Sequence, residues 1–253
     1  SLGLVGSEMC IRDRIATLVA SGSNRKNVTI DEIPINLQHA FVALEDSRFY
    51  EHSGIDLTGI IRAGVTGIAS GGNFSQGAST ITQQLLKNNV FTNWTSESTQ
   101  LERFTRKIQE QYLALKIEKE MSKEEILEAY MNTINLGQGC LGVQTAAQRY
   151  FNKDAKDLTL SECAVIAAIT QSPLNLNPVS NPENNAKRRK KVLKNMKEQG
   201  FITKDEYDEA MADNVYDRIS ETASNTTASK PYTYFIDAVI NQVVDDLVTE
   251  KSY

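Results

Sequence analysis

The sequence predicts a mainly α-helical protein with a short β element near its start. Apolar residues recur at spacings of three and four along much of the chain, which is typical of helices that bury one face. Capping boxes at Ser122–Glu125 and Thr203–Glu206 mark the starts of two of these helices. The chain also lacks P-loop and GxSxG motifs.

The first elements are short. Residues 1–14 resemble a prefix found on unrelated reading frames, so they are left out of the fold prediction. Residues 15–19 are expected to form a strand, and 28–33 a connector with a second strand. Helices are expected at 34–44 and 57–68.

The rest of the chain is expected to be helical up to a linker. Residues 172–182 contain three prolines and are expected to form a wrapping loop. A single domain is predicted over 15–217, followed by a Ser/Thr-rich linker at 218–230 and the start of a further region at 231–253. The expected helices are 78–88, 102–120, 122–132, 143–150, 161–170, 183–199 and 203–214.

Composition excludes several functional classes. The net charge of −5 gives no general basic field for nucleic acid. Three dispersed cysteines and two histidines suggest neither a disulfide framework nor a zinc site, and no metal site is predicted. No run of about 18 apolar residues predicts a spanning helix, although a membrane anchor is expected to be missing from the N-terminus of this chain.

The segment from Glu45 to Gly54 concentrates charge directly after an apolar run, residues 40–44. Carboxylates that follow a buried helix are costly unless they are paired or used. A carboxylate in a partly apolar cleft can act as a proton acceptor near neutral pH. A helix end with solvated charges is an equally good interpretation of this segment alone.

A second polar segment lies at 77–88. On a helix, Thr80, Gln83, Gln84 and Lys87 share one face and offer hydroxyl, amide and ammonium groups to an anionic, oxygen-rich ligand. Taken alone, a solvated polar face is the better interpretation.

A third group is Arg106, Lys107 and Glu110, which share one face of the helix at 102–120. A carboxylate beside two cations stays ionised and makes a poor proton donor. The alternative is an i,i+4 salt-bridge ladder on the surface. The opposite side is an apolar stripe expected to be buried: Phe104, Ile108, Tyr112 and Leu115.

Two separated carboxylates and four cations favour glycosyl transfer from a phosphorylated sugar. A glycosidase needs an acid that protonates a poor leaving group. A pyrophosphate leaves as a stable anion and needs cations instead. The residues are Glu45 and Glu110, with Arg62, Lys87, Arg106 and Lys107.

Five stretches in order carry a specific resemblance. They are Glu45-Asp46-x-x-Phe49-x-x-His52-x-Gly54, Gly77-x-Ser79-Thr80-Ile81-Thr82-Gln83-Gln84-Leu85-x-Lys87-Asn88, Arg106-Lys107-x-x-Glu110, Ile126-Leu127-Glu128-x-Tyr130-Met131-Asn132, and Glu162-x-Ala164 with Arg188-Arg189-x-x-Val192-Leu193. In them the chain resembles the glycosyltransferase domain of class A penicillin-binding proteins and monofunctional peptidoglycan glycosyltransferases, glycosyltransferase family 51. Ala78 stands where the family usually has a glycine. The segment 89–105 is longer and more polar than the corresponding segment of many relatives.

The resemblance implies a lysozyme-like helical fold with a small membrane-facing jaw subdomain. It implies polymerisation of lipid II with inversion and with undecaprenyl pyrophosphate as the leaving group. Glu45 would be the general base, and Glu110 would act at the pyrophosphate. Sugar and phosphate would be bound by Arg62, Ser79, Thr80, Gln83, Gln84, Lys87, Asn88, Arg106 and Lys107. The first motif would be shaped by Asp46, Phe49, His52 and Gly54.

The resemblance also implies partners and a location. These are lipid II, the lipid-linked glycan, cell-wall synthesis proteins and the outer face of a bacterial cell membrane, with no nucleic acid. No cofactor is required, and Mg²⁺ or Mn²⁺ is an optional partner of the pyrophosphate. Membrane contact is expected from apolar residues, although ordinary core is the better interpretation for at least half of them: Ile60, Ile61, Ile68, Phe74, Phe91 and Trp94.

Two other functions remain open at this point. A lysozyme-like hydrolase or lytic transglycosylase would need one protonated glutamate and no phosphate cluster. An inactive glycan- or lipid-binding module would not need both carboxylates and all four cations.

Overall fold

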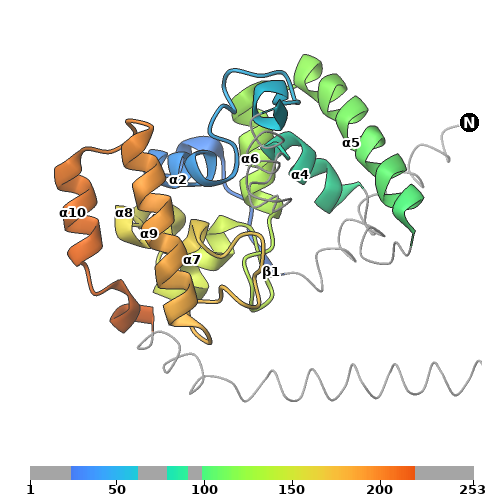
Figure 1. The fold of residues 1–253 in the computed structure, drawn as a ribbon. Coiled ribbons are helices and arrows are strands. Elements are labelled where there is room, and N and C mark those ends of the chain that lie inside the picture. Colours follow the sequence, from blue (N-terminus) through green and yellow to red (C-terminus); the bar gives the residue numbers. More distant parts are fainter. Residues whose placement is uncertain (1–23, 62–78, 91–98, 220–253) are drawn as a thin grey trace, which may run out of the picture.

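A computed structural model describes residues 24–61, 79–90 and 99–219, and this part of the chain is mainly helical, as predicted (Figure 1). The lysozyme-like character, the jaw subdomain and the domain boundaries stay predictions. The α-helices are α2 (Ile35–Glu45), α4 (Ile81–Asn89), α5 (Gln100–Glu120), α6 (Lys123–Thr133), α7 (Val143–Phe151), α8 (Leu160–Ala167), α9 (Pro182–Glu198) and α10 (Lys204–Ala212).

The β structure differs from the prediction. The expected strand at 28–33 is wrong, because Ile30–Glu32 form a 3-10 helix, η1. Strand β1 (Asn24–Arg25) instead pairs in parallel with β2 (Cys140–Leu141). The expected strand at 15–19 lies outside the described residues. A second 3-10 helix, η3, spans Ala155–Asp157.

Helix starts are fixed locally. Capping boxes open α6 at Ser122 and α10 at Thr203, as the sequence predicted. The same arrangement opens α4 at Thr80, α5 at Thr99 and α8 at Thr159. In each box the cap hydroxyl accepts from a backbone N–H of the first turn, which satisfies a donor that has no partner within the helix.

The core lies where α2 packs against α8 and α9 (Figure 1). Helix α8 is buried from Ser161 to Ala167, and α2 contributes the buried side chains Leu37, Phe41 and Val42 to the same core. Helix α4 packs instead against α5 and α6. Glu45, the last residue of α2, therefore ends a core helix.

The predicted orientation of α5 is wrong. The apolar stripe expected in the core is exposed: Phe104 at 64%, Ile108 at 52%, Tyr112 at 60% and Leu115 at 42%. The residues that α5 buries are Glu110 and Ala114. Periodicity identified the two faces of this helix correctly, but the charged face is the one that packs against the rest of the protein.

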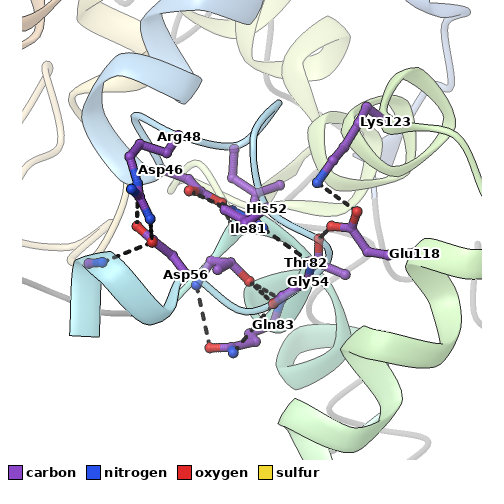
Figure 2. Close-up of polar contacts among 12 residues, drawn as sticks. Asp46, Arg48, His52, Gly54, Asp56, Ile81, Thr82, Gln83, Glu118 and Lys123 are labelled. Atoms are coloured by element: carbon purple, nitrogen blue, oxygen red, sulfur yellow. Dashed lines mark hydrogen bonds and ion pairs between the residues drawn. The ribbon is translucent and has the colours of Figure 1, made fainter. Parts of the chain in front are cut away.

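Polar contacts and one close approach hold α5 in this orientation. Glu118 accepts a hydrogen bond from the Thr82 hydroxyl on α4, at 2.6 Å, and pairs with Lys123 on α6, also at 2.6 Å (Figure 2). At Gly54 a Cβ atom would come within 2.7 Å of the Ala114 backbone, so the loop after α2 rests directly on α5. None of the described helices is long and apolar enough to cross a membrane.

Candidate active site

Glu45 is held by donors from three separate parts of the chain. Its Oε1 accepts from the Thr170 hydroxyl at 2.5 Å and from Arg188 Nη2 at 3.2 Å. Its Oε2 accepts from the side-chain amides of Gln84 at 3.2 Å and Gln171 at 3.4 Å. The Glu45 side chain is only 2% exposed, so the solvated alternative is wrong for this carboxylate.

This arrangement keeps the Glu45 oxygens as hydrogen-bond acceptors. Guanidinium and amide N–H groups can only donate. The Gln84 amide is itself oriented, because its oxygen accepts from the Tyr130 hydroxyl at 3.2 Å. A carboxylate fixed in this way is suited to receive a proton from an approaching hydroxyl group.

Asp46 and His52 pair with each other in the loop that follows Glu45. Asp46 Oδ2 accepts from the backbone N–H of Ile81, at 2.9 Å, in the first turn of α4 (Figure 2). His52 Nδ1 accepts from the Gly54 N–H at 3.1 Å, so Nε2 carries the proton and donates to Asp46 at 2.9 Å. The role of Asp46 and His52 in shaping the first motif stays a prediction.

Thr80 and Gln83 also contact this loop, at Gly54. The Thr80 hydroxyl donates to the Gly54 carbonyl at 2.8 Å. The Gln83 amide approaches the same carbonyl at 3.5 Å (Figure 2). Both side chains are almost fully buried, so a solvated polar face is wrong for this part of α4. Their contact with sugar or phosphate stays a prediction. Phe49 is buried nearby under the Lys123 ammonium, 4.4 Å from its ring centre.

Glu110 has a different environment. It pairs with the Arg106 guanidinium and, at 2.9 Å, with Lys107 Nζ on its own helix. Lys107 Nζ also donates to the Ser79 hydroxyl at 2.8 Å, which joins the second and third motifs. The i,i+4 pair therefore exists, but with a Glu110 side chain that is 1% exposed it is no solvated surface ladder.

Lys87 connects the two carboxylates electrostatically. Burial lowers the pKa of Lys87 below its usual value, and the positive charges of Lys107 and Arg106 lower it further. The charges of Glu110 and Glu45 act in the opposite direction. Lys87 is therefore a half-buried cation whose charge both carboxylates stabilise. Asn88 is exposed near the end of α4, and Arg62 lies outside the described residues.

The donor set at Glu110 does not fit a metal ion held by the protein. The two oxygens of Glu110 already accept from Arg106 and Lys107, and three cations repel a further positive charge. In the described part of the chain, no group of three or more His, Cys, Asp or Glu residues could hold a metal ion.

Sequence reasoning missed three residues that touch Glu45. Thr170, Gln171 and Arg188 lie 125, 126 and 143 positions further along the chain. Arg188 belongs to a basic run, 187–191, in which composition does not distinguish one cation from the next. Its neighbour Arg189 points elsewhere and donates to the Ser161 hydroxyl at 2.8 Å.

Known proteins are similar to this chain over most of its length. Residues 12–197 match the model of the family described as "Transglycosylase". The chain is 43% identical over 243 residues to penicillin-binding protein 1A of Clostridium perfringens, which covers 93% of the chain and 28% of that protein. It is 38% identical over 245 residues to penicillin-binding protein 1A of Streptococcus oralis, with 96% and 37% covered.

A solved structure is also similar to part of the chain. The crystal structure of penicillin-binding protein 1A from Haemophilus influenzae covers 76% of this chain and 18% of that one, with 26% identity and a TM-score of 0.45. The chain thus spans well under half the length of these relatives.

Proposed function

Because the chain belongs to the transglycosylase family, we propose that it is a peptidoglycan glycosyltransferase that polymerises lipid II. The observation that carries the proposal is the contrast between the two carboxylates. Glu45 accepts hydrogen bonds from neutral donors and one arginine, whereas Glu110 is paired with two cations. A proton acceptor at one end and a phosphate cluster at the other are what transfer from a sugar pyrophosphate requires.

In the proposed reaction, the 4-hydroxyl of the acceptor N-acetylglucosamine lies against Glu45. Its oxygen attacks the anomeric carbon of the lipid-linked donor as its proton passes to Glu45. The bond between that carbon and the pyrophosphate oxygen breaks, and the anomeric configuration inverts. The bonding electrons leave with undecaprenyl pyrophosphate, which departs as an anion and needs no proton from the protein.

The proposed role of Glu110 is to hold cations in place. Paired with Arg106 and Lys107, it keeps both side chains directed toward the pyrophosphate. Lys87 adds a third positive charge, which interacts with both Glu110 and Glu45. The pKa of Lys87 is lowered first by burial and then by the charges of Lys107 and Arg106, and an anionic ligand would relieve that repulsion.

We further propose that the exposed stripe of α5 faces the membrane that carries the lipid substrate, on its extracytoplasmic side. Five large apolar side chains follow one another along this helix: Leu101, Phe104, Ile108, Tyr112 and Leu115. Contiguous exposed apolar surface of this kind marks a protein or membrane contact. Ile61, which is 67% exposed, was expected to contact the membrane, whereas Ile68, Phe74, Phe91 and Trp94 lie outside the described residues.

The stripe can be tested with vesicles. Ile108→Asp should reduce the binding of the chain to anionic phosphatidylglycerol vesicles by about tenfold. The membrane would then have to take up a charged side chain in place of an apolar one. Ile35→Asp, at an exposed position on α2, is the matched control and should bind as the unmodified chain does. Equal vesicle binding by Ile108→Asp would contradict a membrane role for α5.

The decisive experiment compares two substrates. The unmodified chain should polymerise lipid II in detergent and leave preformed glycan uncut. Lys87→Ala should lower lipid II turnover by about a hundredfold, because one of the cations at the leaving group is lost, whereas Lys191→Ala, at an exposed position on α9, should not. Cleavage of preformed glycan that survives Lys87→Ala would support a lytic enzyme and refute the proposal.

A further inference from the structure

Thr170 lies in the turn that follows α8, and its hydroxyl is placed between three polar groups. Glu45 Oε1 is 2.5 Å from the Thr170 oxygen, the Ala167 carbonyl oxygen is at 3.0 Å and Arg188 Nη2 is at 3.4 Å. The residue is only 1% exposed, so these groups are its partners in place of bulk water. A separation of 2.5 Å is in the range of a hydroxyl that donates to a charged carboxylate.

The Thr170 hydroxyl has one proton to donate and two lone pairs that accept. The Arg188 guanidinium can only donate, so the Thr170 oxygen accepts from it. The single proton has two acceptors within reach, the Glu45 carboxylate and the Ala167 carbonyl. It serves only one of them at a time. The hydroxyl therefore has two orientations, and the protonation state of Glu45 decides which of them is lower in free energy.

The Ala167 carbonyl is able to take this second hydrogen bond. It lies at the C-terminal end of α8, where the last carbonyls have no partner within the helix. It accepts from the backbone N–H of Thr170 at the long distance of 3.4 Å. A carbonyl oxygen has two lone pairs, so the Thr170 hydroxyl can donate to it without displacing that N–H.

The other partners of Glu45 are donors. Arg188 has no lone pair that accepts a proton, and the Gln84 amide is held as a donor because its oxygen accepts from Tyr130. The Gln171 amide is a longer contact, at 3.4 Å, from an exposed side chain. If the hydroxyl beside it did not turn, a protonated Glu45 would carry a buried O–H group that faces only donors, which is costly.

We propose that Thr170 is a positioning residue that reverses its hydrogen bond with Glu45 when this carboxylate takes up the substrate proton. The inference rests on the proposed role of Glu45 as the base. Before the transfer, the Thr170 hydroxyl donates to Glu45 Oε1. As the O–H bond of the sugar breaks and an O–H bond forms on Glu45, the Thr170 hydroxyl turns to the Ala167 carbonyl and accepts from Glu45. No covalent bond of Thr170 breaks, and the proton later leaves Glu45 for water.

Charged and titratable groups from neighbouring elements interact with Glu45 or lie beside it: Arg188 on α9, Lys87 on α4, Tyr130 on α6, and Asp46 with its partner His52. Burial, and then the charges of Glu45 and Asp46, raise the pKa of Tyr130, so its hydroxyl stays protonated. Glu45→Gln keeps all of these groups and removes only the Glu45 carboxylate. A signal that follows the protonation of Glu45 is therefore lost in this variant, and one that follows Asp46 or His52 is kept.

The test follows two carbon signals through a pH titration of the chain, labelled with ¹³C at the alanine carbonyls and the glutamate carboxyls. The Ala167 carbonyl signal should move with the same midpoint as the Glu45 carboxyl signal, because the hydroxyl turns to Ala167 as Glu45 is protonated. Glu45→Gln and Thr170→Val should each abolish this movement, and Thr170→Ser should retain it. An Ala167 signal that does not follow Glu45 would overturn the proposal, since a hydroxyl that only donates never leaves the carboxylate.

The polymerisation rate gives a second measurement. Thr170→Val should lower kcat about tenfold with little change in KM, because the hydroxyl acts on the base and does not touch the substrate. Thr170→Ser should recover most of this loss, whereas a packing role predicts that the smaller serine is worse than the valine. Thr145→Val is the matched control and should keep full activity, because this buried threonine of α7 has no hydroxyl partner among the described residues. An unchanged kcat in Thr170→Val would overturn the proposal.

The carbon titration needs no turnover, so the two proposals can fail separately. Linked movement of the Ala167 and Glu45 signals in a chain that does not polymerise lipid II would refute the proposed function and support the hydrogen-bond reversal. Polymerisation of lipid II without linked movement would overturn the reversal and leave the proposed function standing.

Discussion

Glu45 and Glu110 are both buried carboxylates, yet they are assembled in different ways. The partners of Glu45 come from α4, from the residues after α8 and from α9, so this site exists only when the chain is folded. The partners of Glu110 are one turn away on α5. The difference shows that the proposed base depends on tertiary structure, whereas the proposed phosphate cluster is largely a property of one helix.

The sharpest test of this contrast is Glu45→Gln. It should lower the kcat for lipid II polymerisation by about a thousandfold, since the amide cannot accept the proton of the attacking hydroxyl. Activity is measured as the rate of glycan formation, and thermal unfolding checks that the variant is folded. Glu51→Gln, a solvent-exposed change six residues away, should keep full activity. A Glu45→Gln variant within tenfold of the unmodified chain would rule Glu45 out as the base.

Glu110→Gln should show the opposite balance between activity and stability. Removing this buried charge leaves Arg106 and Lys107 without their carboxylate, so the free energy of unfolding should fall by about 3 kcal/mol. Turnover should fall by about a hundredfold, less than for Glu45→Gln, because the cations remain but are no longer aligned. Urea unfolding and the polymerisation rate measure the two effects. Glu120→Gln, at the exposed end of α5, is the control.

If Glu110→Gln costs more activity than Glu45→Gln without a loss of stability, the roles given to the two carboxylates are wrong. The comparison is informative because each substitution removes one negative charge and keeps the shape of the side chain.

The same contrast explains what the sequence could predict. The Glu110 cluster follows from helical spacing, and the capping boxes at Ser122 and Thr203 follow from four-residue patterns. Local patterns of this kind are visible without knowing the fold. The pairing of His52 with Asp46, six residues apart in an irregular loop, has no such pattern and was not anticipated.

One wrong prediction and one omission have a physical cause in tertiary structure. The stripe through Ile108 was expected in the core because apolar faces usually are, yet α5 docks through Ala114 and paired charges. Arg188 and Arg189 are neighbours, but only the packing of α9 directs one to Glu45 and the other to Ser161. Periodicity separates the faces of a helix, and only the neighbouring elements decide which face is covered.

Arg188→Lys tests the surroundings of Glu45, which depend on tertiary structure. Arg188 Nη2 contacts Glu45 Oε1 at 3.2 Å and the Thr170 hydroxyl at 3.4 Å, and a lysine cannot reproduce this planar geometry. We expect kcat to fall about tenfold with little change in KM, because Arg188 orients the proposed base. Arg188→Ala should lose more activity than Arg188→Lys. A rise in KM alone would instead indicate that Arg188 binds substrate.

The smallest expected effect is a pH dependence at Lys87, which lies under the influence of both carboxylates. Its pKa is lowered from 10.5 by burial and by the cations of α5, so its charge is present below that lowered pKa and is lost as pH rises through it. The kcat/KM for lipid II should therefore fall on the alkaline side before an exposed lysine would lose its proton. In Lys87→Arg the guanidinium stays charged at alkaline pH. The ratio of kcat/KM at about pH 10 to kcat/KM at neutral pH should therefore be severalfold higher in this variant than in the unmodified chain. Lys191→Arg, on the exposed side of α9, should keep the alkaline fall. An identical fall in Lys87→Arg would show that the positive charge of Lys87 is not what binds the anionic substrate.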